Sequence, residues 1–278
     1  MKLGIFAKTF AGTDPFDVLS AARQAGYRAV QYNMACSGLG PLPQDIPNDV
    51  ASKIVEAADE NGVEIAAVSA TYNMIHPDAA RREEGRRSFA AIAAAARRIG
   101  TRLVTVCTGS RDPEDQWRHH PDNAMFAAWR DMCAEFELLL PIAEKNDIFL
   151  GVEPELANVV NSALQALRLI NTFGTNRIRI VLDPANLFEI ETPERRHALV
   201  QEAVDLLGNA IALAHAKDRH PDGSFATAGK GVLDWDHYLG AVRKAGFEGA
   251  LVTHGLAADE ASAIAAFLAE RIRAAEAA

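Results

Sequence analysis

The sequence has few of the features that mark several common classes of protein. Its three cysteines, Cys36, Cys107 and Cys133, form no CxxC pair, which argues against a disulfide scaffold or a structural zinc knuckle. It has no basic excess, because 28 Lys and Arg stand against 37 Asp and Glu, giving a formal net charge of −9. Proteins that bind a phosphate backbone need clustered Lys and Arg, so we do not expect a nucleic-acid partner.

Long hydrophobic runs are also missing. No stretch approaches the roughly 18 uncharged apolar residues that a membrane span requires. The first apolar run, residues 3–7, ends at Lys8 and is too short for the hydrophobic region of a signal peptide. We therefore expect no membrane association and a reducing, cytoplasmic setting.

The 278 residues show a regular alternation of two patterns. Short apolar runs rich in β-branched residues predict strands, and amphipathic stretches between them predict helices. Helix signals include Pro15 after the N-cap candidate Asp14, and Asn161 as the cap of the helix at residues 162–173. Glycines such as Gly26 follow several helices. The eight predicted strands span residues 2–7, 29–32, 64–69, 103–107, 148–153, 178–183, 210–215 and 250–254. The first predicted helix starts at Pro15 and stops before Gly26. The others span residues 49–60, 79–99, 123–144, 193–207, 235–245 and 258–275.

Strict alternation of strands and helices indicates parallel strands joined by right-handed crossovers. Eight such units use almost the whole chain, which predicts an α/β fold with a single (β/α)8 TIM barrel, residues 1–278 forming one domain. An open doubly wound sheet is the alternative. No GxGxxG follows the first predicted strand, which disfavours it.

Polar residues collect where the predicted strands end, which is where barrel enzymes place their chemistry. Glu153, Asp183 and His215 each end an apolar strand. Any one of them could be a helix cap or a core residue. Because side chains alternate along a strand, all three would meet at the barrel mouth if their faces point inward. Two carboxylates and an imidazole suit Mn²⁺, Mg²⁺, Co²⁺ or Zn²⁺.

Other polar residues near the same ends are candidates for substrate binding. Lys8 and Lys217 would stabilise an oxyanion, or else form surface ion pairs. Trp117 would form a wall of a sugar pocket, or else pack within its own loop. Cys107 has no evident paired base, so we do not expect a thiol nucleophile. The further candidates that follow strands are Asn33, Thr108, Glu155 and Asn186.

The chain resembles the xylose isomerase-like TIM barrel superfamily, which includes sugar phosphate isomerases and epimerases and endonuclease IV. The resemblance rests on Val152-Glu153-Pro154-Glu155, on Leu182-Asp183-Pro184-Ala185-Asn186 and on His215-Ala216-Lys217-Asp218. The family's metal site commonly uses Glu, Asp, His and a second Glu from strands five to eight. Glu153, Asp183 and His215 match the first three, and His254 stands where the second Glu is expected.

The resemblance implies an isomerase or epimerase that uses one divalent metal ion to act on a sugar, sugar phosphate or keto-sugar. Glu153 would remove the proton α to the carbonyl, and Lys217 or Lys8 would stabilise the developing oxyanion. His254 would replace the missing ligand or return the proton. The implied partner is a small sugar or sugar derivative, and a homo-oligomer is compatible with the sequence.

Three alternatives stay open. A metal-dependent dehydratase of keto-sugars or inososes begins with the same proton abstraction and then expels a hydroxyl. An endonuclease IV-like phosphodiesterase needs several metals and extra histidines, of which only His76 lies near the third strand. A non-catalytic sugar-binding barrel is compatible with the loss of the second Glu.

Overall fold

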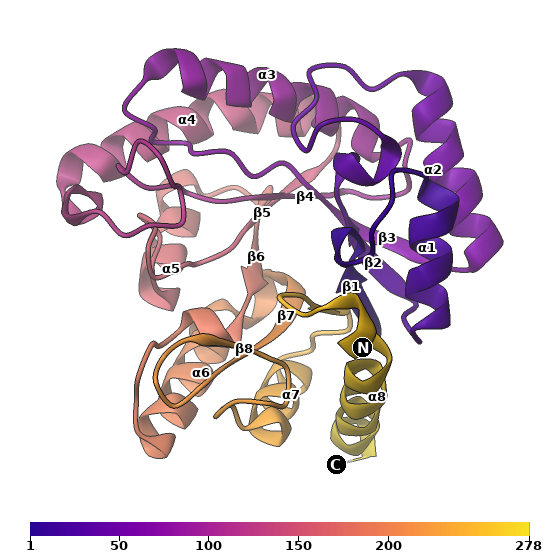
Figure 1. Cartoon of the computed structure of the whole chain (residues 1–278). Helices are drawn as coiled ribbons and strands as arrows, with labels where there is room; N and C mark the ends of the chain where they lie inside the picture. The colour runs from indigo at the N-terminus through magenta and orange to yellow at the C-terminus, as the bar shows by residue number, and fades with distance from the viewer. Residues whose placement is uncertain (278) are drawn as a thin grey trace.

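The computed structural model describes residues 1–277 and shows a closed barrel of parallel strands inside a ring of helices (Figure 1). Ala278, the last residue of the predicted domain, lies outside the described residues. Each barrel strand pairs in parallel with the next along the chain, and the last pairs with the first, which closes the sheet. The (β/α)8 prediction is confirmed and the open sheet is excluded. The barrel strands are β1 (Lys2–Phe6), β2 (Ala29–Tyr32), β3 (Glu64–Ser69), β4 (Leu103–Val106), β5 (Phe149–Val152), β6 (Ile178–Leu182), β7 (Ile211–Arg219) and β9 (Ala250–Thr253).

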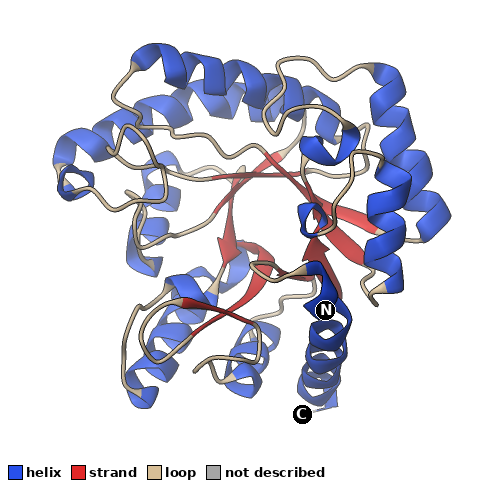
Figure 2. Cartoon of the chain, viewed as in Figure 1, coloured by secondary structure: helices blue, strands red, loops and turns tan. Residues whose placement is uncertain are grey.

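Helices surround the strands on all sides (Figure 2). The Asp14 carboxylate accepts the Phe16 N–H at 3.0 Å and so caps the first helix as predicted. None of these helices is long and apolar enough to cross a bilayer, a statement that covers residues 1–277. The helices are α1 (Pro15–Gln24), α2 (Asn48–Asn61), α3 (Ala79–Ala96), α4 (Phe126–Lys145), α5 (Ala163–Phe173), α6 (Pro193–Leu207), α7 (Trp235–Lys244) and α8 (Ala261–Ala277).

Three predicted helix starts are wrong. The helix predicted from residue 258 begins at Ala261, after a 3₁₀ turn over Ala258–Glu260. The cap of α5 is Ser162 and not Asn161, because the Ser162 hydroxyl accepts the Gln165 N–H at 3.3 Å. The helix predicted from residue 123 begins at Phe126. Asn123 instead donates its side-chain amide to Ser110 and to the Ala157 carbonyl, which ties this segment to neighbouring loops.

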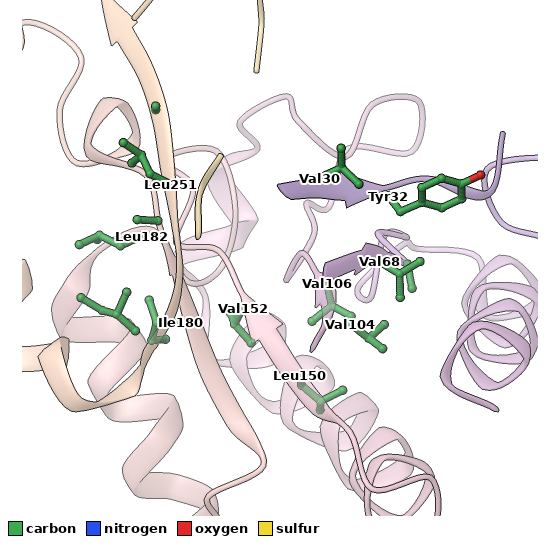
Figure 3. Close-up of a cluster of buried hydrophobic side chains, with 14 of the residues drawn as sticks. Val30, Tyr32, Val68, Val104, Val106, Leu150, Val152, Ile180, Leu182 and Leu251 are labelled. Carbon is green, nitrogen blue, oxygen red and sulfur yellow. The ribbon is translucent and has the colours of Figure 1, made fainter. Parts of the chain in front are cut away.

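Apolar side chains form two layers, one inside the barrel and one between the barrel and the helices. Along β6, Val181 belongs to the inner cluster. Its neighbours Ile180 and Leu182 belong to the outer layer (Figure 3). The interior is narrow, and a Cβ on Gly151 would lie 3.1 Å from side-chain atoms of Leu103 and of Val181. The same alternation directs the residues at the ends of β5, β6 and β7 toward the barrel mouth.

One element was not predicted. Strand β7 continues past the barrel to Arg219 and forms an antiparallel hairpin with β8 (Phe225–Thr227). The loop after this hairpin is held by the buried Asp218 carboxylate, which accepts the Gly229 N–H at 3.1 Å and the Trp235 indole N–H at 3.1 Å. The hairpin therefore stands over the barrel mouth beside the ends of the strands.

Candidate metal and substrate site

Four side chains with metal-ligating atoms meet at the barrel mouth. Glu153 follows β5, Asp183 follows β6, His215 lies in β7 and His254 follows β9, and their ligand atoms all lie within 4.8 Å of one another. His215 Nδ1 is 3.1 Å from Glu153 Oε1, and His254 Nε2 is 3.2 Å from Asp183 Oδ2. Donor atoms that share one ion through bonds of about 2.1 Å have separations of this size.

The orientation of His215 is fixed by Gln31 in β2. The Gln31 amide donates to the Ser69 hydroxyl at 3.1 Å and to the Thr105 hydroxyl at 3.0 Å. Its oxygen is thereby left to accept from His215 Nε2 at 2.9 Å. This network assigns a ring hydrogen to Nε2 and leaves Nδ1 as the ring atom that faces Glu153.

This arrangement is a test of whether a metal fits. Nδ1 and the Glu153 carboxylate oxygen lie 3.1 Å apart, a contact that either a proton on Nδ1 or a metal ion bound by both atoms satisfies. Two carboxylates and two imidazoles are a donor set suited to a divalent transition metal. The four residues therefore fit the metal ion that the sequence predicts.

Charge around the site keeps both carboxylates ionised. Burial opposes ionisation of Glu153, but His215 outweighs it, and the pKa of Glu153 lies below its usual value. Burial likewise opposes ionisation of Asp183, but Lys217 and then His254 hold its pKa far below the usual range. Burial would lower the pKa of Lys217, but Asp183 and Glu153 raise it above normal, so the ammonium stays charged.

Lys217 is held beside the four residues by several contacts. Its Nζ lies 3.2 Å from Asp183 Oδ2 and 3.3 Å from the Asn186 side-chain oxygen. The Asn186 amide in turn donates to Glu153 Oε1 at 2.9 Å. The Phe225 ring of the hairpin covers the ammonium, with its centroid 3.8 Å from Nζ. Lys217 is therefore held beside the candidate ligands Glu153 and Asp183.

A cavity of about 640 Å³ opens above these residues. Its lining includes Glu153, His215, His254 and Lys217, and the predicted substrate-binding residues Lys8, Asn33 and Glu155 also line it. The Glu155 carboxylate has no hydrogen-bond partner among residues 1–277, and burial followed by the Glu153 charge raises its pKa to about 7. Trp117 and Phe225 supply aromatic surface to the same cavity. Its volume is typical of a small-molecule site.

Two predicted substrate-binding residues do not line the cavity. Thr108 is fully buried and its hydroxyl accepts the Val160 N–H at 3.0 Å, so its contact is with the backbone of a neighbouring loop. Asn186 is also fully buried and connects Glu153 to Lys217, which places it behind the two residues and not against a ligand. Thr108 therefore holds a loop in place, and Asn186 holds the Glu153 and Lys217 side chains in place.

Sequence reasoning missed Gln31, Thr105 and Phe225. Gln31 and Thr105 lie within β2 and β4, whereas the predicted site residues follow the ends of strands. Gln31 comes two residues after Ala29, and Thr105 comes two residues after Leu103, so each shares the inward face of its strand. A polar residue on the inward face of an apolar strand is a signal that the sequence does contain. Phe225 lies on the unpredicted hairpin and had no such signal.

Two other candidates have structural contacts. The Cys107 thiol is buried and donates to the Tyr72 carbonyl, and burial raises its pKa to about 12, which agrees with the absence of a nucleophile. His76 contacts the Pro113 carbonyl through Nε2 and the Asp78 N–H through Nδ1. Within the part of the chain that the structure describes, the four residues at the barrel mouth are the one such metal-ligand group, and His76 does not belong to it.

The chain belongs to the xylose isomerase-like TIM barrel family, whose pattern matches residues 19–274. Comparison with curated proteins gives no match.

Solved structures share the fold along nearly their full length. A 3-keto-D-glucoside 4-epimerase from E. coli has a TM-score of 0.78 and 15% identity, with 97% of this chain and 99% of that chain covered. The IolI protein with a bound zinc atom has a TM-score of 0.71 and 18% identity, with 98% of each chain covered. AsbF from Bacillus anthracis, described as a probable 3-DHS dehydratase, has a TM-score of 0.76 and 12% identity, with 97% and 99% covered.

Proposed function

We propose that this protein is a divalent-metal-dependent isomerase or epimerase that acts on a sugar, sugar phosphate or keto-sugar. The observation that carries the proposal is the convergence of Glu153, Asp183, His215 and His254 at the floor of a polar cavity. Similar structures include a keto-glucoside epimerase and a protein with bound zinc, which supports both the chemistry and the metal.

A divalent ion held by the four residues would polarise a substrate carbonyl and stabilise the negative charge that develops on it. Glu153 is anionic and lines the cavity, so it is the base that accepts the proton from the carbon next to the carbonyl. Lys217 donates a hydrogen bond to the oxygen on which charge develops, and Asn186 and Asp183 hold its ammonium in place.

The fate of the proton separates the two reaction types. Return by Glu153 to the neighbouring carbon on the same face would isomerise an aldose and a ketose with one base. Epimerisation requires a proton donor on the opposite face of the substrate, and the cavity offers Glu155 and His254 for that position. We assign His254 to the metal, because its Nε2 lies 3.2 Å from Asp183 Oδ2 within the group of ligand atoms.

The test is to load the protein with Zn²⁺, Co²⁺ or Mn²⁺ and incubate it with a panel of ketoses and keto-sugars in D₂O. We expect deuterium at a carbon next to the carbonyl, with a product that has lost no water. Glu153→Gln should abolish the exchange, because an amide cannot accept the proton. Loss of water from the product would assign the dehydratase reaction instead. Metal binding without exchange for any member of the panel would contradict the enzyme proposal and favour a sugar-binding barrel.

A further inference from the structure

A second cavity of about 440 Å³ lies next to the cavity above the metal ligands, and Trp117 lines both. Tyr72 and His76 from the segment after β3 form part of its wall. Arg81 and Glu84 from the start of α3 form another part, and Gln116 lies beside Trp117 in the loop before α4. The two cavities therefore share the indole as a common boundary.

Trp117 is exposed, and hydrogen bonds tie the backbone of its loop to neighbouring residues. Trp117 is 46% exposed to solvent. Its backbone N–H donates to the Asp115 carboxylate at 2.9 Å. The preceding carbonyl, that of Gln116, accepts from the Asn158 amide at 2.8 Å. The following carbonyl, that of Arg118, accepts from the Ser110 hydroxyl at 2.6 Å. These bonds hold the backbone on both sides of Trp117, and its exposed indole offers apolar surface to a ligand in either cavity.

Some of the polar groups around the second cavity have no partner within the protein. Among residues 1–277, the side chains of Arg81, Glu84 and Gln116 and the Trp117 indole N–H have no hydrogen-bond or ion-pair partner. Arg81 and Glu84 carry opposite charges. Further carboxylates line the same cavity, including Glu114, so its lining is acidic and disfavours a phosphate or carboxylate. Mixed donors and acceptors beside an aromatic ring suit neutral hydroxyl groups.

We propose that the second cavity is a subsite for a neutral, polyhydroxylated group joined to the sugar that reacts, so that the substrate is a glycoside or a comparable two-part sugar. This inference rests on the proposed function. The reacting ring occupies the cavity above Glu153 and His215, and the second group passes Trp117 to contact Arg81 and Glu84.

The test compares one-ring and two-ring probes on the zinc-loaded protein. The probes are methyl glucoside and a panel of glucose disaccharides with different linkages, and binding is measured by calorimetry. We expect at least one disaccharide to bind about tenfold more tightly than methyl glucoside. The double variant Arg81→Ala/Glu84→Ala should reduce that gain to about twofold or less while leaving methyl glucoside binding unchanged.

The matched control is Glu83→Ala/Arg87→Ala, which removes an exposed ion pair of 2.8 Å from the same helix but outside the cavity. This control should keep the tenfold gain. The disaccharide should also protect Trp117 from acrylamide quenching, since Trp129 and Trp235 are at least 90% buried.

Equal binding of one-ring and two-ring probes would overturn the subsite, as would a gain that survives in Arg81→Ala/Glu84→Ala. If the deuterium exchange described above still occurs, the proposed function stands without the subsite. If no exchange occurs with any substrate, the function fails and this inference fails with it.

Discussion

Among the four candidate ligands, Gln31 forms a hydrogen bond with His215 alone. It donates its two amide hydrogens to the hydroxyl groups of Ser69 and Thr105. Because the orientation of His215 depends on the Gln31 side-chain oxygen, we predict that Gln31→Leu weakens Zn²⁺ binding by about 10- to 100-fold. Competition with a chromophoric chelator measures the change. Ser69→Ala and Thr105→Val should each give smaller losses, since each removes one of the two anchors.

The control for Gln31 is Thr253→Val. Thr253 is a buried barrel hydroxyl that donates to the Ala216 carbonyl and does not contact Gln31. Its loss should leave the dissociation constant of Zn²⁺ unchanged. A Gln31→Leu protein that binds Zn²⁺ as tightly as the wild type would show that His215 is oriented without this network.

His254 stands where the resemblance in sequence implies a second Glu, and the structure places it among the four candidate ligands. We predict that His254→Ala weakens Zn²⁺ binding at least about tenfold, whereas His254→Glu keeps a complete ligand set and shifts preference toward Mn²⁺ and Mg²⁺. Dissociation constants for the three ions on each variant measure both effects. A His254→Ala protein that retains its metal and its turnover would remove His254 from the site.

The sequence was informative where one residue both ends a strand and carries a ligating atom. Glu153, Asp183 and His215 satisfied both conditions, and their convergence followed from side-chain alternation. The partners of these residues could not be found in that way. Gln31 acts through two hydroxyls from β3 and β4, and such a network depends on how three strands stack in space.

At the scale of elements, the barrel strands were predictable because each is a short apolar run between helix signals. Strands β2 and β3 have the predicted bounds, whereas β1, β4, β5, β6 and β9 end one residue early. The reason is visible at Asp183, whose carboxylate accepts the Ala185 N–H at 2.9 Å and so begins a turn. Strand β8 has three residues and is stabilised by pairing with β7, so local pattern did not reveal it.

At the end of the barrel opposite the cavity, Asp147 precedes β5 and forms ion pairs with Arg102 before β4 and Arg177 before β6. Asp147 follows α4, has φ of 52°, and contacts Arg177 at 2.9 Å as well as Arg102 and Arg97. The hydrogen bond from Arg177, together with Arg102 and Arg97, lowers the pKa of Asp147 below 3.8. Residues at this end of a barrel serve stability and not catalysis.

We predict that Asp147→Asn unfolds at a lower urea concentration than the wild type at pH 7, although Asn tolerates the positive φ. Because the folded-state pKa is lowered, the ionised Asp147 contributes stability above its unfolded pKa of about 3.8 and loses it as pH falls through the folded value. The difference between variant and wild type should therefore close below pH 3.8. Glu202→Gln, an exposed change on α6, should show no such pH-dependent difference. A constant difference from pH 7 to pH 2 would contradict the charge-based account.

At the scale of the whole molecule, the four candidate ligands come from β5, β6, β7 and β9 and so connect the second half of the barrel. An unfolded chain cannot hold them together, and a metal that binds them stabilises the folded state alone. Similar structures at 12–18% identity keep the same barrel, so this fold tolerates extensive change in sequence.

We predict that metal removal lowers the melting temperature by roughly 5 to 10 °C when the ion had been present at about 100 times its dissociation constant. Two imidazoles among four ligands favour Zn²⁺ and Co²⁺ over Mn²⁺ and Mn²⁺ over Mg²⁺, so the stabilisation should follow that order. Differential scanning calorimetry with and without chelator measures it. His215→Ala should lose the response, whereas His237→Ala, which removes a surface ring stacked on His197, should keep it. A response that persists in His215→Ala would place the stabilising ion elsewhere on the chain.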